Sequence, residues 1–172
     1  VGELIAEHLP DIPFSLSHKL NPALREYRRA SATSIDASLK PLMTDYLNNL
    51  TNRLKSEGFS GETLVLTSQG GMIEAEEMAA APIHAINSGP SMAPIAGRYY
   101  AQLECDEDSL IIADTGGTTY DVSLVRKNRI PKTRETWIGQ SFRGHMTGFP
   151  SIDIKSVGAG GGSIAKVDEG GI

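Results

Sequence analysis

Residues 110–125 read LIIADTGGTTYDVSLV, and this stretch indicates the fold of the region around it. An apolar run from Leu110 to Ala113 leads into a glycine turn, and apolar and polar side chains alternate after the turn. Continuous apolar runs are typical of buried strands, and alternation is typical of half-buried strands. We therefore expect a hairpin whose first strand lies at the centre of a sheet. Asp114 would then stand at the carboxyl end of that strand, where α/β sheets bind ligands.

The turn after Asp114 is a candidate anion site. Gly116 and Gly117 allow positive φ and close approach of the backbone, and their amides, with those of Thr118 and Thr119, can point together at phosphate oxygens. Because a bare carboxylate repels a polyphosphate, Asp114 is the candidate catalytic residue and Mg²⁺ anchor, acting through water. The threonine hydroxyls add neutral donors. The alternative is an ordinary β-turn in which Asp114 bonds the following amides.

Asp121 follows the turn on the second strand of the hairpin. It alternates with Val122 and Leu124, so we expect its side chain to face away from the core, from where it could point back toward the turn. A solvated strand aspartate is the alternative.

A run of small residues at 158–162 forms a second glycine-rich segment. It is no dinucleotide fingerprint, because Ser163 follows it and residues 163–167 have the pattern of a strand instead of a helix. We expect Gly160, Gly161 and Gly162 to let the backbone pass close to a nucleotide or another lobe. A flexible turn is the alternative.

The rest of the chain alternates between helical and extended patterns. Alternation predicts strands at 14–20 and 152–157, and a bounded apolar run predicts another at 63–67. Apolar spacings of three and four predict a long helix over 34–57, kinked or started by Pro41, a short helix from Glu74 to Pro82, and a helix after Asn87-Ser88-Gly89-Pro90. Three segments, 110–113, 119–125 and 130–137, read as an antiparallel meander.

These elements predict an α/β fold, with a mixed sheet containing the meander and with flanking helices. A boundary near residues 84–90 would separate a helical α/β portion from the lobe that carries the hairpin. Since the chain begins with Val1 instead of Met, inside a helical pattern, we expect an internal fragment of a longer protein.

Composition excludes several classes of protein. Sixteen Lys and Arg against 21 Asp and Glu give a net charge of −5, which argues against a nucleic-acid partner. No apolar run is long enough to predict a membrane span. The single cysteine, Cys105, cannot form a disulfide framework, and a reducing cytoplasmic compartment fits this composition.

Three further residues are candidates of lower rank. His145 lies in a glycine-rich loop where a substrate could be met, although a surface imidazole is the plainer reading. Ser88 and Gly89 precede Pro90, and helix capping by Ser88 explains the pattern without chemistry. The four histidines have no spacing that predicts a metal site.

Residues 114–125 resemble the second phosphate motif of the hydantoinase A/5-oxoprolinase family. Three further matches occur in the family's order, and they are Ser68-Gln69-Gly70-Gly71, Asn87-Ser88-Gly89-Pro90 and residues 151–165. Segments 135–137 and 144–150 are similar to those of members described as acetone or acetophenone carboxylase subunits. The family also includes N-methylhydantoinase, and its members belong to the actin-like, ribonuclease H-like ATPases.

The resemblance implies an ATP- and Mg²⁺-dependent enzyme. Family members couple ATP hydrolysis to attack on cyclic amides, such as hydantoin and 5-oxoproline, or on ketones. The resemblance further implies a partner subunit or domain. It places the first phosphate motif upstream and the nucleoside region downstream of this chain, so this chain alone is expected to bind ATP weakly and to hydrolyse none. The alternative is a non-catalytic scaffold lobe whose helix over 34–57 docks a partner.

Overall fold

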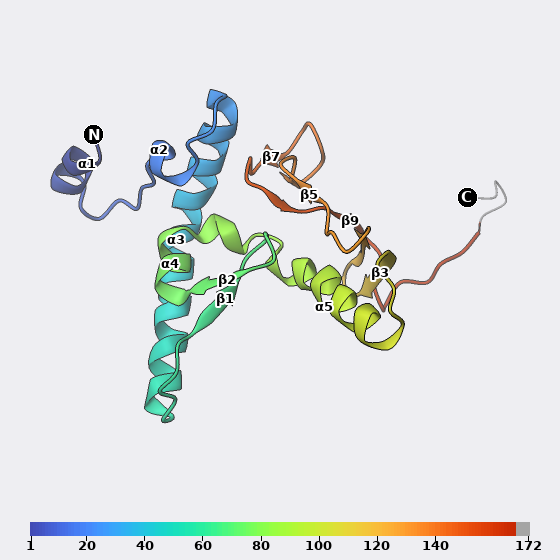
Figure 1. Cartoon of the computed structure of the whole chain (residues 1–172). Helices are drawn as coiled ribbons and strands as arrows, with labels where there is room; N and C mark the ends of the chain where they lie inside the picture. The colour runs from blue at the N-terminus through green and yellow to red at the C-terminus, as the bar shows by residue number, and fades with distance from the viewer. Residues whose placement is uncertain (168–172) are drawn as a thin grey trace. The chain divides into compact units, whose positions relative to one another are not determined.

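The computed structural model describes residues 1–167 (Figure 1). Its helices are α1 (Gly2–His8), α2 (Ser17–Leu20), α3 (Glu26–Ser56), α4 (Ala75–Ala80), the 3₁₀-helix η1 (Pro82–Ala85) and α5 (Ser88–Glu104). Its strands are β1 (Leu64–Leu66), β2 (Met72–Glu74), β3 (Leu110–Thr115), β4 (Tyr120–Val125), β5 (Lys132–Thr133), β6 (Trp137–Ile138), β7 (His145–Met146), β8 (Ser151–Ile152) and β9 (Ile154–Val157).

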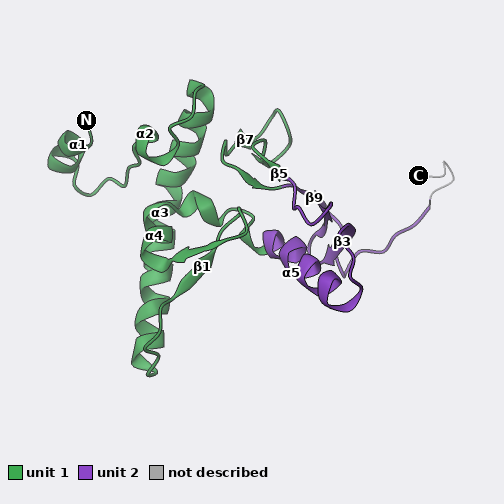
Figure 2. Cartoon of the chain, viewed as in Figure 1, with its two compact units in different colours: residues 1–89, 132–152 green, residues 90–131, 153–172 purple. Residues whose placement is uncertain are grey.

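The chain divides into two compact units, coloured separately in Figure 2. Unit 1 comprises Val1–Gly89 and Lys132–Ile152. Unit 2 comprises Pro90–Pro131 and the chain from Asp153 onward. The chain therefore leaves unit 1 within the first turn of α5, returns at β5, and leaves again between β8 and β9.

Unit 1 is built around α3, which packs against α4 and η1 (Figure 1). One cluster of buried side chains joins Ala32 of α3 to Ile83 of η1 and to Phe149. A second cluster joins Leu47 of α3 to Ala75 and Met78 of α4. The other members packed against these clusters are Leu20, Ile35, Met43, Val65, Ile73, Ala79, Ala85 and Ile86. Unit 1 therefore has a core made chiefly of helix contacts.

Helix α3 is longer than its apolar pattern predicted. It begins at Glu26, eight residues before the predicted start at Ser34, and continues through Pro41. The first turns carry Glu, Arg and Ala, which favour helix without giving an apolar period, so periodicity missed them. The predicted end is confirmed, because the helix stops at Ser56 and Gly58 takes a positive φ of 89°.

The strand predicted at 14–20 is wrong. Residues 17–20 form the short helix α2, and Leu20 packs against the cluster of Ala32, Ile83 and Phe149. Leu16 and Leu20 are four residues apart. This spacing places them on one face of a strand, and it also places them on one face of a helix, one turn apart. The strand at 63–67 and the short helix that stops before Pro82 are confirmed as β1 and α4.

Unit 2 contains one three-stranded antiparallel sheet in the order β3-β4-β9. Within residues 1–167 the 110–113 segment is therefore an edge strand, which contradicts the expectation of a buried central strand. Ile111 is 74% exposed, because α5 covers only one face of the strand. All paired strands described are antiparallel, which corrects the predicted mixed sheet.

The predicted meander is correct for its first two strands and wrong for the third. A tight turn at Lys127 and Asn128, whose φ values are 48° and 60°, reverses the chain as expected. Pro131 lacks the amide that a third ladder would need, and the chain instead enters unit 1, where β5 pairs with β8. The place beside β4 is taken by β9. The strand predicted at 163–167 is also absent from the part of the chain that is described.

Candidate functional site

The hairpin of residues 110–125 is held by a complete cross-strand register. Six pairs run from Leu110↔Val125 to Thr115↔Tyr120, and they place Asp114 directly opposite Asp121. Helix α5 lies against β3 at Gly97, where an added Cβ would stand 2.7 Å from Cγ1 of Ile112. The absence of a side chain at Gly97 therefore sets the approach of the helix to the hairpin.

Asp121 does not face away from the core, which corrects the expectation from alternation. It is 7% exposed and shares a face of β4 with Ser123 and Val125, which are also buried. Its Oδ2 accepts a hydrogen bond of 3.1 Å from the hydroxyl of Thr119, and its Oδ1 is buried with no partner among the described residues. The solvated-strand alternative is therefore wrong as well.

Asp114 and Asp121 form a like-charged cross-strand pair. Directly opposed residues point to the same side of a sheet with Cβ atoms about 4.5–5.5 Å apart, and like charges at such positions destabilise the pairing. Asp114 is exposed, and within residues 1–167 the Thr119 hydroxyl is the only hydrogen-bond or ion-pair partner of either carboxylate. A cation held between two carboxylates would remove this repulsion.

The tip of the hairpin presents uncommitted amides. The Gly116 amide donates to the Thr119 carbonyl at 2.9 Å, so it closes the turn. The amides of Gly117, Thr118 and Thr119 donate no hydrogen bond within residues 1–167. Neither glycine adopts a φ in the left-handed range, so the expected use of positive φ is wrong.

The glycine run packs directly on the hairpin tip. Gly161 donates a 3.0 Å hydrogen bond to the carbonyl of Gly116. A Cβ at Gly160 would lie 2.5 Å from the Gly117 oxygen and 2.8 Å from the Thr118 nitrogen. Backbone thus meets backbone at Gly160, and only glycine allows this contact. A Cβ at Gly162 would meet nothing within 4 Å.

Two serines of this region were missed by the sequence reasoning. Ser163 holds the glycine run, since its hydroxyl accepts from the Gly160 amide at 3.0 Å and its own amide donates to the Gly160 carbonyl at 2.8 Å. Ser156 of β9 stands opposite Asp121, on the side away from Asp114. The alternation of residues 152–157 was the signal that could have placed Ser156 on this face.

The remaining candidates lie in unit 1. Ser88 and Gly89 are the first two residues of α5 and precede the change of unit. His145 is exposed on β7, where it pairs with Ile138 of β6. The structure therefore brings together the candidates at 114–121 and 160–162 within unit 2, and it places Ser88, Gly89 and His145 in the other unit.

The residues of the tip fit magnesium-bound phosphates. Three free amides match anionic oxygens, and Mg²⁺ is commonly bound by one or two carboxylates together with substrate phosphates. The orphaned Oδ1 of Asp121 and the exposed carboxylate of Asp114 supply those ligands. No group of three or more His, Cys, Asp or Glu side chains converges within residues 1–167, so the phosphates would have to complete such a site.

No helix within residues 1–167 is long and apolar enough to cross a bilayer.

Comparison with known proteins identifies the family to which the chain is similar. The family model described as hydantoinase/oxoprolinase matches residues 29–172. The chain is 34% identical over 169 residues to caprolactamase subunit alpha of Pseudomonas jessenii, covering 98% of the chain and 24% of that protein. It is 28% identical over 176 residues to the gamma subunit of acetophenone carboxylase of Aromatoleum aromaticum, covering 99% of the chain and 23% of that protein. The chain thus spans about a quarter of the length of these relatives.

Two solved structures have the same fold. The ATP-dependent caprolactamase of P. jessenii superposes with a TM-score of 0.78 at 32% identity, over 98% of this chain and 24% of that one. The nucleotide-free structure of acetone carboxylase, an enzyme of ATP-dependent acetone carboxylation, superposes with a TM-score of 0.70 at 25% identity, over 89% of this chain and 21% of that one. The matched range, most of the chain, shows that this chain belongs to the hydantoinase/oxoprolinase family.

Proposed function

We propose that this chain contributes a phosphate-binding hairpin for MgATP to an ATP-dependent hydrolase or carboxylase that acts on cyclic amides or ketones. One observation supports this most strongly, namely that Asp114 stands opposite Asp121 beside three amides that make no hydrogen bond to any described residue. The solved relatives are described as ATP-dependent, and both curated relatives are named as subunits, which supports a nucleotide and a partner subunit or domain.

When bound, ATP with Mg²⁺ supplies a transferable phosphoryl group that activates a substrate oxygen. Phosphate oxygens accept from the amides of Gly117, Thr118 and Thr119. The backbone of the turn does not have to rearrange for this, because the Gly116 hydrogen bond already closes it. The carboxylates of Asp114 and Asp121 would hold the cation.

Two contacts fix this arrangement. The hydroxyl of Thr119 donates to Oδ2 of Asp121, which leaves Oδ1 without a partner among the described residues. Gly160 packs against the peptide bond between Gly117 and Thr118, so the tip cannot move toward Gly160 when a phosphate binds. Gly161 and Gly162 continue this segment and would lie beside the nucleotide.

A scaffold role is the second candidate, and one observation favours it. Leu42 and Tyr46 of α3 are 68% and 57% exposed, one turn apart, as on a helix that docks a partner. In that case the hairpin would be structural and its acids dispensable.

Neutralising Asp114 separates the two functions. In the complete enzyme, Asp114→Asn should reduce ATP turnover roughly 100-fold or more, because it removes a preorganised charge from the phosphate site. Asp106→Asn is the matched control, since Asp106 is an exposed acid of the same unit and its φ of 53° is one that Asn tolerates. Unchanged turnover in Asp114→Asn, with the fold intact by circular dichroism, would overturn the assignment.

A further inference from the structure

Unit 1 contains a cavity of about 740 Å³ that the phosphate site does not use. It opens at the turn between β1 and β2 and is bounded by α4, η1 and Lys132 of β5. Its volume lies within the range of small-molecule sites, roughly 300–1,000 Å³. All of its lining residues belong to unit 1.

The wall of the cavity is held rigidly. Thr67 donates its amide to the Gly71 carbonyl at 2.9 Å, and Gly70, at a φ of 84°, donates to the Thr67 carbonyl at 3.0 Å. The Ser68 amide donates to the carbonyl of His84 at 2.8 Å, which joins the turn to η1. The turn and the backbone of His84 therefore form one hydrogen-bonded surface.

Four polar side chains line the cavity without partners of their own. The side chains of Gln69, Glu77, His84 and Lys132 make no hydrogen bond or ion pair with any described residue. His84 is half-buried and packs edge-on against the ring of Phe149 at 4.9 Å. Burial lowers the pKa of His84, and the nearby charge of Asp36 opposes this shift. The neutral imidazole offers one donor and one acceptor.

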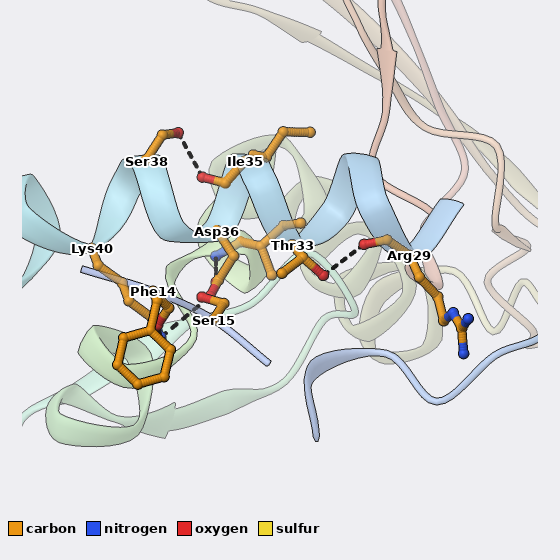
Figure 3. A network of polar contacts seen from close by, with 9 residues as sticks. Phe14, Ser15, Arg29, Thr33, Ile35, Asp36, Ser38 and Lys40 are labelled. Atoms are coloured by element: carbon orange, nitrogen blue, oxygen red, sulfur yellow. Dashed lines mark hydrogen bonds and ion pairs between the residues drawn. The ribbon is translucent and has the colours of Figure 1, made fainter. Parts of the chain in front are cut away.

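Asp36 positions His84 through the backbone. It is fully buried on α3, where Oδ1 accepts the Ile83 amide at 3.1 Å and Oδ2 accepts the Ser15 hydroxyl at 2.5 Å (Figure 3). Lys40 lies 3.7 Å from the same carboxylate. Because Ile83 directly precedes His84, this network anchors the turn of η1 that carries the imidazole.

We propose that this cavity binds a small neutral amide, with His84, Gln69 and Glu77 pairing the carbonyl and N–H of the ligand. The choice of substrate class rests on the proposed function, whereas the location rests on the cavity. The opposed charges of Glu77 and Lys132 leave the wall without a net charge, so neither an anion nor a cation is favoured. Met72, Ile73 and Ala80 supply apolar surface for ring methylenes.

A ketone of the same shape fits this cavity less well. It accepts hydrogen bonds but donates none, so it cannot donate to the exposed carboxylate of Glu77 or to the half-buried amide oxygen of Gln69. A lactam gains a hydrogen bond to a charged acceptor there that the ketone does not make.

Pyrrolidin-2-one and cyclopentanone are matched probes, since they share a five-membered ring and a carbonyl and differ at the N–H. We expect saturation-transfer NMR on the complete protein to detect pyrrolidin-2-one and to give at least tenfold weaker binding for cyclopentanone. Glu77→Ala should weaken pyrrolidin-2-one binding about tenfold. Glu76→Ala, the neighbouring acid of α4 that does not line this cavity, should leave it unchanged.

Three results would overturn the proposal. They are no binding of pyrrolidin-2-one, equal binding of the two probes, and equal effects of the Glu76 and Glu77 variants. Gln69→Ala serves as a second test from the turn side of the cavity and should also weaken pyrrolidin-2-one binding. Failure here is distinct from failure of the phosphate site, because Asp114→Asn should stop ATP turnover and leave pyrrolidin-2-one binding intact, whereas Glu77→Ala should leave ATP binding intact.

Discussion

Replacing Gly160 by alanine should displace the hairpin tip. The new methyl group would stand 2.5 Å from the oxygen and 2.6 Å from the carbon of the Gly117 carbonyl, and 2.8 Å from the Thr118 nitrogen. These are backbone atoms of a closed turn, so they cannot rotate away as a flexible side chain could. One of the two segments must shift.

The cost follows from two opposing effects. Overpacking a tight contact costs about 1–3 kcal/mol, and a backbone neighbour places this case near the upper end. Alanine also restricts the unfolded chain, which offsets about 0.4–1 kcal/mol. The net loss is about 2 kcal/mol, or roughly a 30-fold fall in the ratio of folded to unfolded unit 2.

This loss of stability can be measured by unfolding the protein in urea and following amide hydrogen exchange at residues 110–125. Gly161→Ala and Gly162→Ala are controls, since their methyl groups would meet only the Gly116 oxygen at 3.8 Å or nothing within 4 Å. We expect both controls to be neutral or slightly stabilising. Equal destabilisation by all three substitutions would refute the argument that Gly160 is required by close backbone contact.

Two further predictions concern the Asp36 network and His84. Asp36→Ala should destabilise unit 1 by about 3–5 kcal/mol in urea unfolding, because the Ile83 amide loses its acceptor and Lys40 loses its ion-pair partner. Asp36→Asn should destabilise it less, since Asn can accept from the Ile83 amide and donate to the Ser15 hydroxyl. Equal losses of stability in the two variants would contradict this reasoning. The pKa of His84 in the folded protein lies below the ordinary 6.5, so as the pH falls the unfolded chain binds a proton at His84 before the folded chain does. Its contribution to stability should be complete above about pH 6.5 and lost as the pH falls through the folded pKa. His84→Gln should therefore reduce the change of the urea midpoint between pH 7.5 and 5.5, and an unchanged slope would count against a half-buried His84 that is neutral in the folded protein.

Elements with their own local signal could be predicted from sequence. Helix α5 has Pro90 in its first turn, and β1 and α4 are bounded by glycines and Pro82, so all three were located. The hairpin was located because two glycines separate two strand patterns. Its register, which places Asp114 opposite Asp121, was not predicted and is a finding of the structure.

Features that depend on distant residues could not be predicted in the same way. An apolar run such as 110–113 does not say whether both neighbours of a strand are present, so its edge position was missed. The buried face of Asp121 depends on α5, which packs through Gly97. Asp36 did carry a signal, because it lies beside Ile35 and four residues from Ala32 on the face of α3 that packs into the core. An acid at such a position needs buried partners, and these come from 21 and 47 residues away.

The most direct test of the phosphate site is amide hydrogen exchange at Gly117, Thr118 and Thr119 in the complete protein, with and without MgATP. These amides make no hydrogen bond in the described chain, so binding to phosphate oxygens should slow their exchange at least tenfold. The Gly116 amide, already bonded to Thr119, serves as the internal reference and should change little. Unchanged exchange at all three residues, under conditions where MgATP is bound to the protein, would contradict the proposed role of the hairpin.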